Sequence, residues 1–291
     1  MQTEQLTGTN ESGISNGAYT IKDLEKFYTQ SDEADKELFA EQRSNILLIT
    51  GEHYNRLRSN FFRRLRDSRS ISNEQKIRLT KNHIQKITEA YTNQIVSTAP
   101  GVGFEPEIES DLQDQKSAEL NHAVWQYAKE KHSLDEAVQN WCEDFVGIGE
   151  VATKIFYDPE ENDMVFEEVF GFNLLVDSAA TNFSKARYAI IRKMVDTQAL
   201  KKMYPGEDHA KFIQESADTT YTIFDRGKGA YTRSKDQCLV REFYFRPCAK
   251  FPNGYFYYTV KEHILSEGEL PGGLFPIIFK PFKRLPTKAR G

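Results

Sequence analysis

The segment that decides the fold runs from Asn140 to Asp177 and reads NWCEDFVGIGEVATKIFYDPEENDMVFEEVFGFNLLVD. It continues an amphipathic pattern that begins at Leu134, with apolar residues spaced by three and four, which predicts a helix. After Gly149 the apolar period changes to two, and alternating runs flank the acidic stretch DPEEND, which predicts a β-hairpin. The segment therefore joins a helical half of the chain to a strand-rich half.

Gly147 and Gly149 form a G-x-G at this junction, and a glycine pair of this kind can bind phosphate. A dinucleotide fingerprint requires a strand, then G-x-G-x-x-G, then a helix whose N-terminus faces the phosphates. Here the order is helix, G-x-G, strand, and Ala152 occupies the third glycine position. A Walker-type G-K-[ST] is also absent from the sequence. The pattern favours a structural turn in which glycine ends the helix.

The helical half extends upstream of this segment. Thr20 and Ser31 are predicted N-caps, and Gly51 is the predicted stop of the first helical stretch. The sequence SLDE predicts a capping box in which the side chains of Ser133 and Glu136 satisfy each other's backbone N–H groups. The further helices are predicted from residue 72 or 73 to about 97, from 111 to 131, and from 133 onward.

The strand-rich half follows the hairpin. The run RYAIIRKMV predicts a strand that leads into a short helix capped by Asp196 and ended by Tyr204-Pro205-Gly206. Three more strands are predicted at CLVREFYF, YFYYTV and LFPIIFKPF. Helices followed by strands, with one helical insertion, predict an α+β fold rather than an alternating βαβ series. We divide the chain into a flexible polar tail (1–19), a helical part (20–149) and a strand-rich part (150–291).

Composition limits the possible partners. The chain has 291 residues, a net charge of −5 and a pI near 5.8, whereas a protein that wraps nucleic acid is usually basic. Contact with DNA should therefore be confined to a small region, or be made by a surface that guides DNA but binds it only weakly. Three cysteines without a C-x-x-C pair exclude a disulfide scaffold and favour a reducing compartment. We expect no membrane contact, because no apolar run is long enough to cross a bilayer.

No motif indicates catalysis or a cofactor. The acidic run that starts at Asp158 departs from a calcium loop, because Asp163 and Val169 occupy its glycine and glutamate positions. The six histidines are scattered, which argues against a zinc site. Cys142, between Trp141 and Phe145, is interpreted as a small buried hydrophobic residue. We therefore predict a protein that is not an enzyme and binds no metal or cofactor.

One basic run stands out in this acidic chain. Arginine and phenylalanine interleave there, which suits phosphate contact with base stacking but equally suits a subunit interface or pairing within the chain. The interface or intramolecular reading is favoured over nucleic acid. The candidate residues are Arg56, Arg58, Arg63, Arg64, Arg66 and Arg69 with Phe61 and Phe62.

Residues 147–206 resemble the portal proteins of tailed bacteriophages, closest to the long-chain portals of short-tailed phages. The resemblance lies in the order of motifs: a helix ending at G-x-G, a strand ending in Tyr-Asp, a strand carrying Glu, a D-x-x-A run and a short helix ending in Tyr-Pro. This chain departs at Glu150, where an aromatic residue is common, and at Phe172-Asn173, where a proline often stands. The matching positions are Gly147, Gly149, Tyr157, Asp158, Glu167, Glu168, Asp177, Ala180, Arg187, Tyr188, Tyr204 and Pro205.

The resemblance implies a homo-oligomeric ring, usually of twelve copies, at one vertex of the capsid. Double-stranded DNA would pass through its axial channel during packaging and ejection. A separate terminase ATPase, a tail adaptor, scaffold protein and the major capsid protein would be its partners, in the virion and in the host cytoplasm during assembly. The chain resembles the wing of such proteins, and we expect it to continue into stem and clip beyond Gly291.

Two other classes stay open at this point. The first is a monomeric α+β module that binds protein or nucleic acid, and the second is an enzyme of unknown chemistry. Stoichiometry separates a ring from a monomeric module. Tight, salt-dependent DNA binding by a monomer would favour the module.

Overall fold

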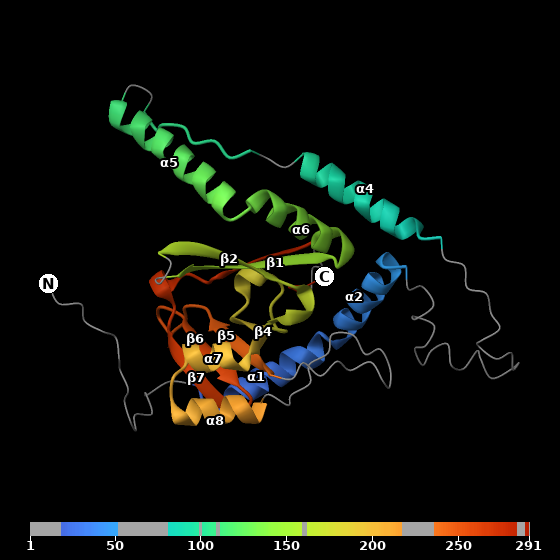
Figure 1. Cartoon of the computed structure of the whole chain (residues 1–291), viewed down its shortest axis with the longest axis vertical. Coiled ribbons are helices and arrows are strands. Elements are labelled where there is room, and N and C mark those ends of the chain that lie inside the picture. The colour runs from blue at the N-terminus through green and yellow to red at the C-terminus, as the bar shows by residue number, and fades with distance from the viewer. Residues whose placement is uncertain are drawn as a thin grey trace, which may run out of the picture.

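The computed structural model describes residues 19–51, 81–98, 101–108, 111–158, 162–216, 236–283 and 289–290. Helices dominate up to residue 147, and the strands that follow form two antiparallel sheets (Figure 1). The predicted α+β fold is confirmed. The helices of the first half are α1 (Ile21–Ala34), α2 (Lys36–Ile49), α4 (His83–Ser97), α5 (Leu112–Lys131) and α6 (Leu134–Gly147).

Several predicted helix ends are confirmed by their hydrogen bonds. Thr20 caps α1 in a full capping box with Asp23, and Asp111 caps α5 through the N–H of Gln113. α2 ends at Ile49, just before Gly51, whose φ of +83° suits glycine. The predicted start of the next helix, at residue 72 or 73, lies outside the described residues.

The prediction that Ser31 is an N-cap is wrong. Ser31 lies inside α1 and is fully buried, with its hydroxyl 3.1 Å from the hydroxyl of Tyr188. The helical path changes direction only at Asp35, which separates α1 from α2. A hydroxyl one turn before the break can turn inward to a buried partner, so the local cap signal is overridden by tertiary contact.

The predicted capping box at Ser133 is also wrong. Ser133 has φ 48° and ψ 44°, in the left-handed region, and its side chain makes no cap hydrogen bond. An N-cap that reaches forward needs an extended backbone. α5 ends at Lys131 and α6 begins at Leu134, so the chain bends from one helix into the next within two residues, and the left-handed backbone of Ser133 at this bend is not the capping conformation (Figure 1).

The first sheet has the order β2-β1-β8, from β1 (Glu150–Asp158), β2 (Asp163–Val169) and β8 (Ile277–Pro281). The predicted hairpin is the β1–β2 pair, in which Asp158 pairs with Asp163. β8 joins the other edge of β1, with Phe279 opposite Ala152. The predicted strand near the end of the chain therefore returns to the hairpin that begins the strand-rich half.

The second sheet has the order β3-β4-β5-β6-β7. Its strands are β3 (Leu174–Val176), β4 (Tyr188–Asp196), β5 (Gln237–Phe245), β6 (Tyr255–Val260) and β7 (His263–Glu269). The sequence predicted β4, β5 and β6 but missed β3 and β7. The predicted short helix is α7 (Thr197–Met203), capped by Asp196, and a second helix that was missed, α8 (Glu207–Ser216), follows at once.

The elements stack in layers, with α1 and α2 on one face of the second sheet and the first sheet on the other (Figure 1). Leu24 and Phe39 pack on the ring-rich face that contains Tyr188 and Phe243. Between the sheets, the buried ammonium of Lys154 lies 2.6 Å from a Glu242 carboxylate oxygen. α6 covers the outer face of the first sheet, and α4 and α5 pack on α6.

The helix-to-strand junction is a short turn. α6 ends at Gly147, Ile148 is its C-cap, and Gly149 has φ +94° before β1 begins at Glu150. The carbonyl of Gly149 accepts from the N–H of Phe282, 2.8 Å away. The left-handed backbone at Gly149 is the conformation that glycine adopts at no steric cost.

We expect Gly149→Ala to lower the free energy of unfolding by about 1–2 kcal/mol, because a Cβ strains a left-handed backbone. Gly103→Ala is the matched control, since a Cβ at either glycine would meet no atom within 4 Å but only Gly149 has a positive φ. The control should change stability by less than about 0.5 kcal/mol. Urea unfolding midpoints measure both, and equal effects would contradict a conformational role for Gly149.

Candidate functional site

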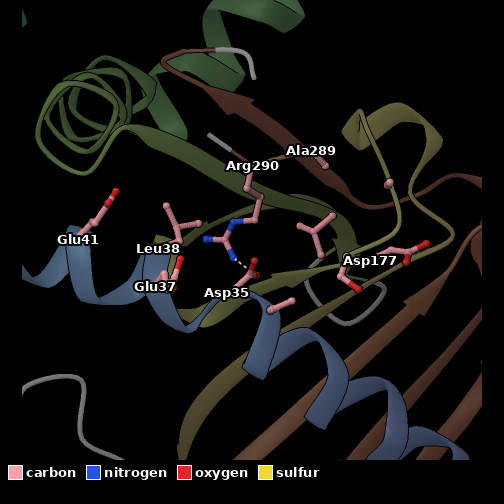
Figure 2. A pocket seen from close by; sticks show the side chains of 11 residues that line it. Asp35, Glu37, Leu38, Glu41, Asp177, Ala289 and Arg290 are labelled. Atoms are coloured by element: carbon pink, nitrogen blue, oxygen red, sulfur yellow. Dashed lines mark hydrogen bonds and ion pairs between the residues drawn. The ribbon is translucent and has the colours of Figure 1, made fainter. Parts of the chain in front are cut away.

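Arg290 lies at the centre of a buried ionic cluster, with its side chain pointing toward Asp35 at the junction of α1 and α2 (Figure 2). Its Nε donates to Oε2 of Glu150 at 3.1 Å, and its Nη2 donates to Oε1 of the same carboxylate. Its Nη1 donates to Oδ2 of Asp35 at 2.7 Å. Arg290 is only 4% exposed and Glu150 only 1%.

Two backbone carbonyls complete the cluster, which we call the Arg290 clamp. Leu174 O accepts from Nη1 at 2.6 Å, and Gly171 O accepts from Nη2 at 2.9 Å. All five N–H groups that a guanidinium carries therefore have an acceptor. The clamp joins the α1–α2 junction, the start of β1, the turn before β3 and the segment after β8.

The electrostatics of the clamp depend on this pairing. Burial opposes the charge of Arg290, but the two carboxylates outweigh it and hold the pKa of Arg290 above its usual value. For Asp35 burial is the larger effect and raises the pKa of its carboxyl, despite the opposing attraction of Arg290. A buried ion pair is stable only while both partners remain, because a single buried charge costs several kcal/mol.

Two neighbours shape the carboxylate of Glu150. Nε2 of Gln42 on α2 donates to its Oε1 at 2.7 Å. A Cβ at Gly171 would lie 2.8 Å from that same oxygen, so a side chain at 171 would displace the clamp. Glu150, where an aromatic residue is common in the resembling proteins, is thus the main acceptor for Arg290.

A cavity of about 250 Å³ adjoins the clamp, with acidic side chains of α2 along one side (Figure 2). Across it, the carboxylate of Asp177 is held by Arg187 through two hydrogen bonds of 2.6 and 2.9 Å. Burial of Asp177 is outweighed by these bonds and by backbone donors, and its pKa is lowered. The motif residues Asp177 and Arg187 therefore form a structural pair. The described residues contain no cluster of side chains that could hold a metal ion.

Two helix faces carry large apolar side chains on the molecular surface. The α4 stripe consists of Ile84, Ile87 and Tyr91, and the last two are 57% and 58% exposed. The α5 stripe consists of Leu120, Val124 and Tyr127, which are exposed to a similar degree. Both helices lie along the edge of the molecule away from α7 and α8 (Figure 1). Contiguous exposed apolar surface of this kind marks interaction sites.

Beside α5 lies an apolar cavity of about 510 Å³, which we call the tryptophan groove. Its walls come from α5, α6, the extended segment near Val102 and the outer face of the first sheet. Both tryptophans of the chain line it. The apolar lining residues are Val102, Trp125, Leu134, Val138, Trp141, Val151, Ile155, Phe166 and Ile278.

The candidate residues predicted from sequence fall in different places. The basic run with its arginines and phenylalanines, from Arg56 to Arg69, lies outside the described residues. Gly147 and Gly149 lie at the α6–β1 turn described above. Cys142 is half-buried, and burial raises the pKa of its thiol. Within the described ranges, no helix is long and apolar enough to cross a membrane.

Sequence reasoning missed the clamp. Asp35 and Arg290 belong to no motif and lie far apart in the chain, so no local pattern could pair them. The single available signal was Glu150, a charged residue at a position where an aromatic one is common. The helices that carry the exposed stripes were predicted, but the period of a sequence pattern does not tell what covers a helix face.

Exposed apolar helix faces are typical of a protein that associates with other molecules. The family model described as Phage P22-like portal protein matches residues 65–279 of this chain. The chain therefore belongs to that portal family, as the resemblance predicted. The family is structural rather than enzymatic, and membership implies a capsid-associated oligomer. A search of curated proteins found no match.

We expect Arg290→Met to lower the free energy of unfolding by about 3–5 kcal/mol, because Glu150 and Asp35 would remain buried without their cation. The loss should be largest above pH 7 and smaller near pH 5. Orphaned buried carboxyls have pKa values above those of the unfolded chain, so the variant loses stability as pH rises through them.

Urea unfolding at the two pH values measures this effect. Lys129→Met is the control, because it breaks an ion pair with Asp135, whose side chain is 81% exposed, and should cost less than about 1 kcal/mol. Adding Glu150→Gln to Arg290→Met should recover part of the loss at pH 8. Equal losses for Arg290→Met and Lys129→Met would show that burial of the clamp does not increase its contribution to stability.

Proposed function

We propose that this chain forms a closed ring of about twelve copies at one capsid vertex, with an axial channel for DNA packaging and ejection. Membership of the P22-like portal family supports this proposal. The observation from the structure that supports it most directly is the exposure of the α4 and α5 stripes, since apolar helix faces on a water-soluble surface need a partner.

The charge of the chain suits passage of DNA. A net charge of −5 leaves few phosphates neutralised by the chain as a whole, so DNA would slide rather than be held. The ring would serve as a platform for the terminase ATPase and the tail adaptor and would contact scaffold and major capsid proteins. It would act in the virion and assemble in the host cytoplasm, without a cofactor or catalysis of its own.

The test of this proposal is to express the protein from its complete open reading frame and to measure the mass of the assembly in solution. Negative-stain images of the same sample show its shape. A ring of about a dozen copies with a central hole is the expected result. A protein that stays monomeric at high concentration and with its scaffold protein would overturn the ring. It would favour the monomeric protein- or nucleic-acid-binding module.

The basic segment from Arg56 to Arg69 is proposed to contact a neighbouring subunit or packaged DNA. We expect Arg63→Glu combined with Arg64→Glu to reduce ring yield or the DNA content of particles by about tenfold, because repulsion replaces attraction. The matched control is Lys202→Glu combined with Lys211→Glu, two exposed lysines on α7 and α8. Normal rings with normal DNA content in the arginine variant would exclude this role.

A further inference from the structure

A pair of histidines joins α8 to the second sheet. His209 lies on α8 and His263 is the first residue of β7. Nδ1 of His209 lies 2.9 Å from Nε2 of His263, which is hydrogen-bond distance, and both rings are partly buried. We propose that this histidine pair holds α8 on the sheet at neutral pH and releases it when both rings are protonated. This inference does not depend on the proposed ring.

The contact between the two rings tolerates one added proton but not two. A hydrogen bond between imidazole nitrogens needs an N–H on one ring and a lone pair on the other. The neutral pair meets this requirement, and so does the pair with one extra proton. When both rings are charged, two N–H groups face each other at 2.9 Å and the two positive charges repel.

Neighbouring groups limit how the rings can turn away from each other. The ring of Phe212 on α8 stacks on His263, with ring centroids 4.2 Å apart and planes 14° from parallel. On the other side, a Cβ at Gly206 would lie 3.0 Å from Cδ2 of His209, so the backbone before α8 passes close to that ring. Repulsion between the rings is therefore relieved by movement of α8 away from β7.

The charges around the pair set the direction of the pH effect. Burial and the ring of His209 lower the pKa of His263, and the exposed carboxylate of Asp208 opposes them. In the turn before β7, Lys261 and Glu262 are exposed and carry opposite charges. Because the ring of His263 binds its proton less readily in the docked helix, docking is strongest above about pH 6.5 and weakens as the pH falls below that value.

The other elements that contact α8 are α7, β5 and β6. From α7, Lys201 donates to Oε1 of Gln214 on α8 at 2.6 Å, and burial, followed by the charge of Glu242, raises the pKa of Tyr204 to about 12, so its phenol stays neutral. Ile213 of α8 lies in a buried cluster with residues of these elements and of β7. The other buried members of this cluster are Leu200, Cys238, Val240, Val260 and Leu265. Release of α8 would therefore expose apolar surface and a buried thiol.

Hydrogen–deuterium exchange of the complete protein, with a metal chelator present, tests this inference. After correction for the intrinsic effect of pH, peptides that cover residues 207–216 should exchange at least about tenfold faster at pH 5.0 than at pH 7.5. His209→Asn places an uncharged amide near the position of Nδ1, which can accept from either protonation state of His263. This variant should change by less than about twofold between the two pH values.

His263→Gln is the second variant, because its amide lies near the position of Nε2, and it should also lose the pH response. His122→Asn, at an exposed histidine on α5, is the matched control and should keep the wild-type response. Equal exchange of wild-type α8 at the two pH values would overturn the inference. A full wild-type response in both His209→Asn and His263→Gln would overturn it too, because other groups would then be responsible.

The cysteines give a second measurement. Cys238 is fully buried in the cluster beneath α8, whereas Cys248 is exposed. Labelling both thiols with a dipyridyl disulfide and taking the ratio of their rates corrects for the effect of pH on thiol reactivity. The ratio of Cys238 to Cys248 labelling should rise about tenfold from pH 7.5 to pH 5.0 in wild type and stay constant in His209→Asn. A constant ratio in wild type would exclude release of α8.

Discussion

One buried positive charge fixes how the parts of this protein meet. Arg290 donates to Glu150, Asp35 and two backbone carbonyls, and these acceptors belong to segments that are distant in sequence. Its removal would leave buried carboxylates without a counter-charge, which makes the arrangement all-or-none. Glu150 directly follows the turn at Gly149 that joins α6 to β1. The clamp therefore also fixes the position of α6, and of the helices that pack on it, relative to the first sheet.

Other buried ion pairs also connect elements of the interior. Lys154 bridges the two sheets to Glu242, and Asp32 on α1 binds Arg192 on β4. Such pairs add little stability compared with apolar packing, but they tolerate few alternative arrangements. The α4 and α5 stripes are different, because they are apolar and exposed and have nothing in the described fold to cover them. The arrangement of the interior therefore depends on specific ion pairs. The exposed apolar stripes are available for association with other molecules.

Sequence patterns predicted the elements whose signals are local. The change of period at Gly149 located α6 and the β1–β2 hairpin, and a hydroxyl and a carboxyl cap located the starts of α1 and α7. The misplaced cap at Ser31 and the missing capping box at Ser133 show the limit, since a tertiary contact overrode the first motif and a left-handed backbone overrode the second. β3 is too short to show a period, and β7 is too polar. The clamp could not be predicted, because Glu150 and Arg290 are separated by most of the strand-rich half.

Neither buried ion pairs nor apolar contacts are weakened much by salt. Mobile ions screen exposed charges over about 8–10 Å at physiological ionic strength but hardly reach Arg290, which is 4% exposed. Apolar association is not weakened by salt either. In a proposed portal ring, core and subunit contacts would thus keep their strength beside densely packed DNA and its counterions. Only contacts between basic residues and phosphate would weaken as salt rises. The proposed ring would thus keep its shape at high salt and bind DNA only weakly, which is the combination that a DNA channel needs.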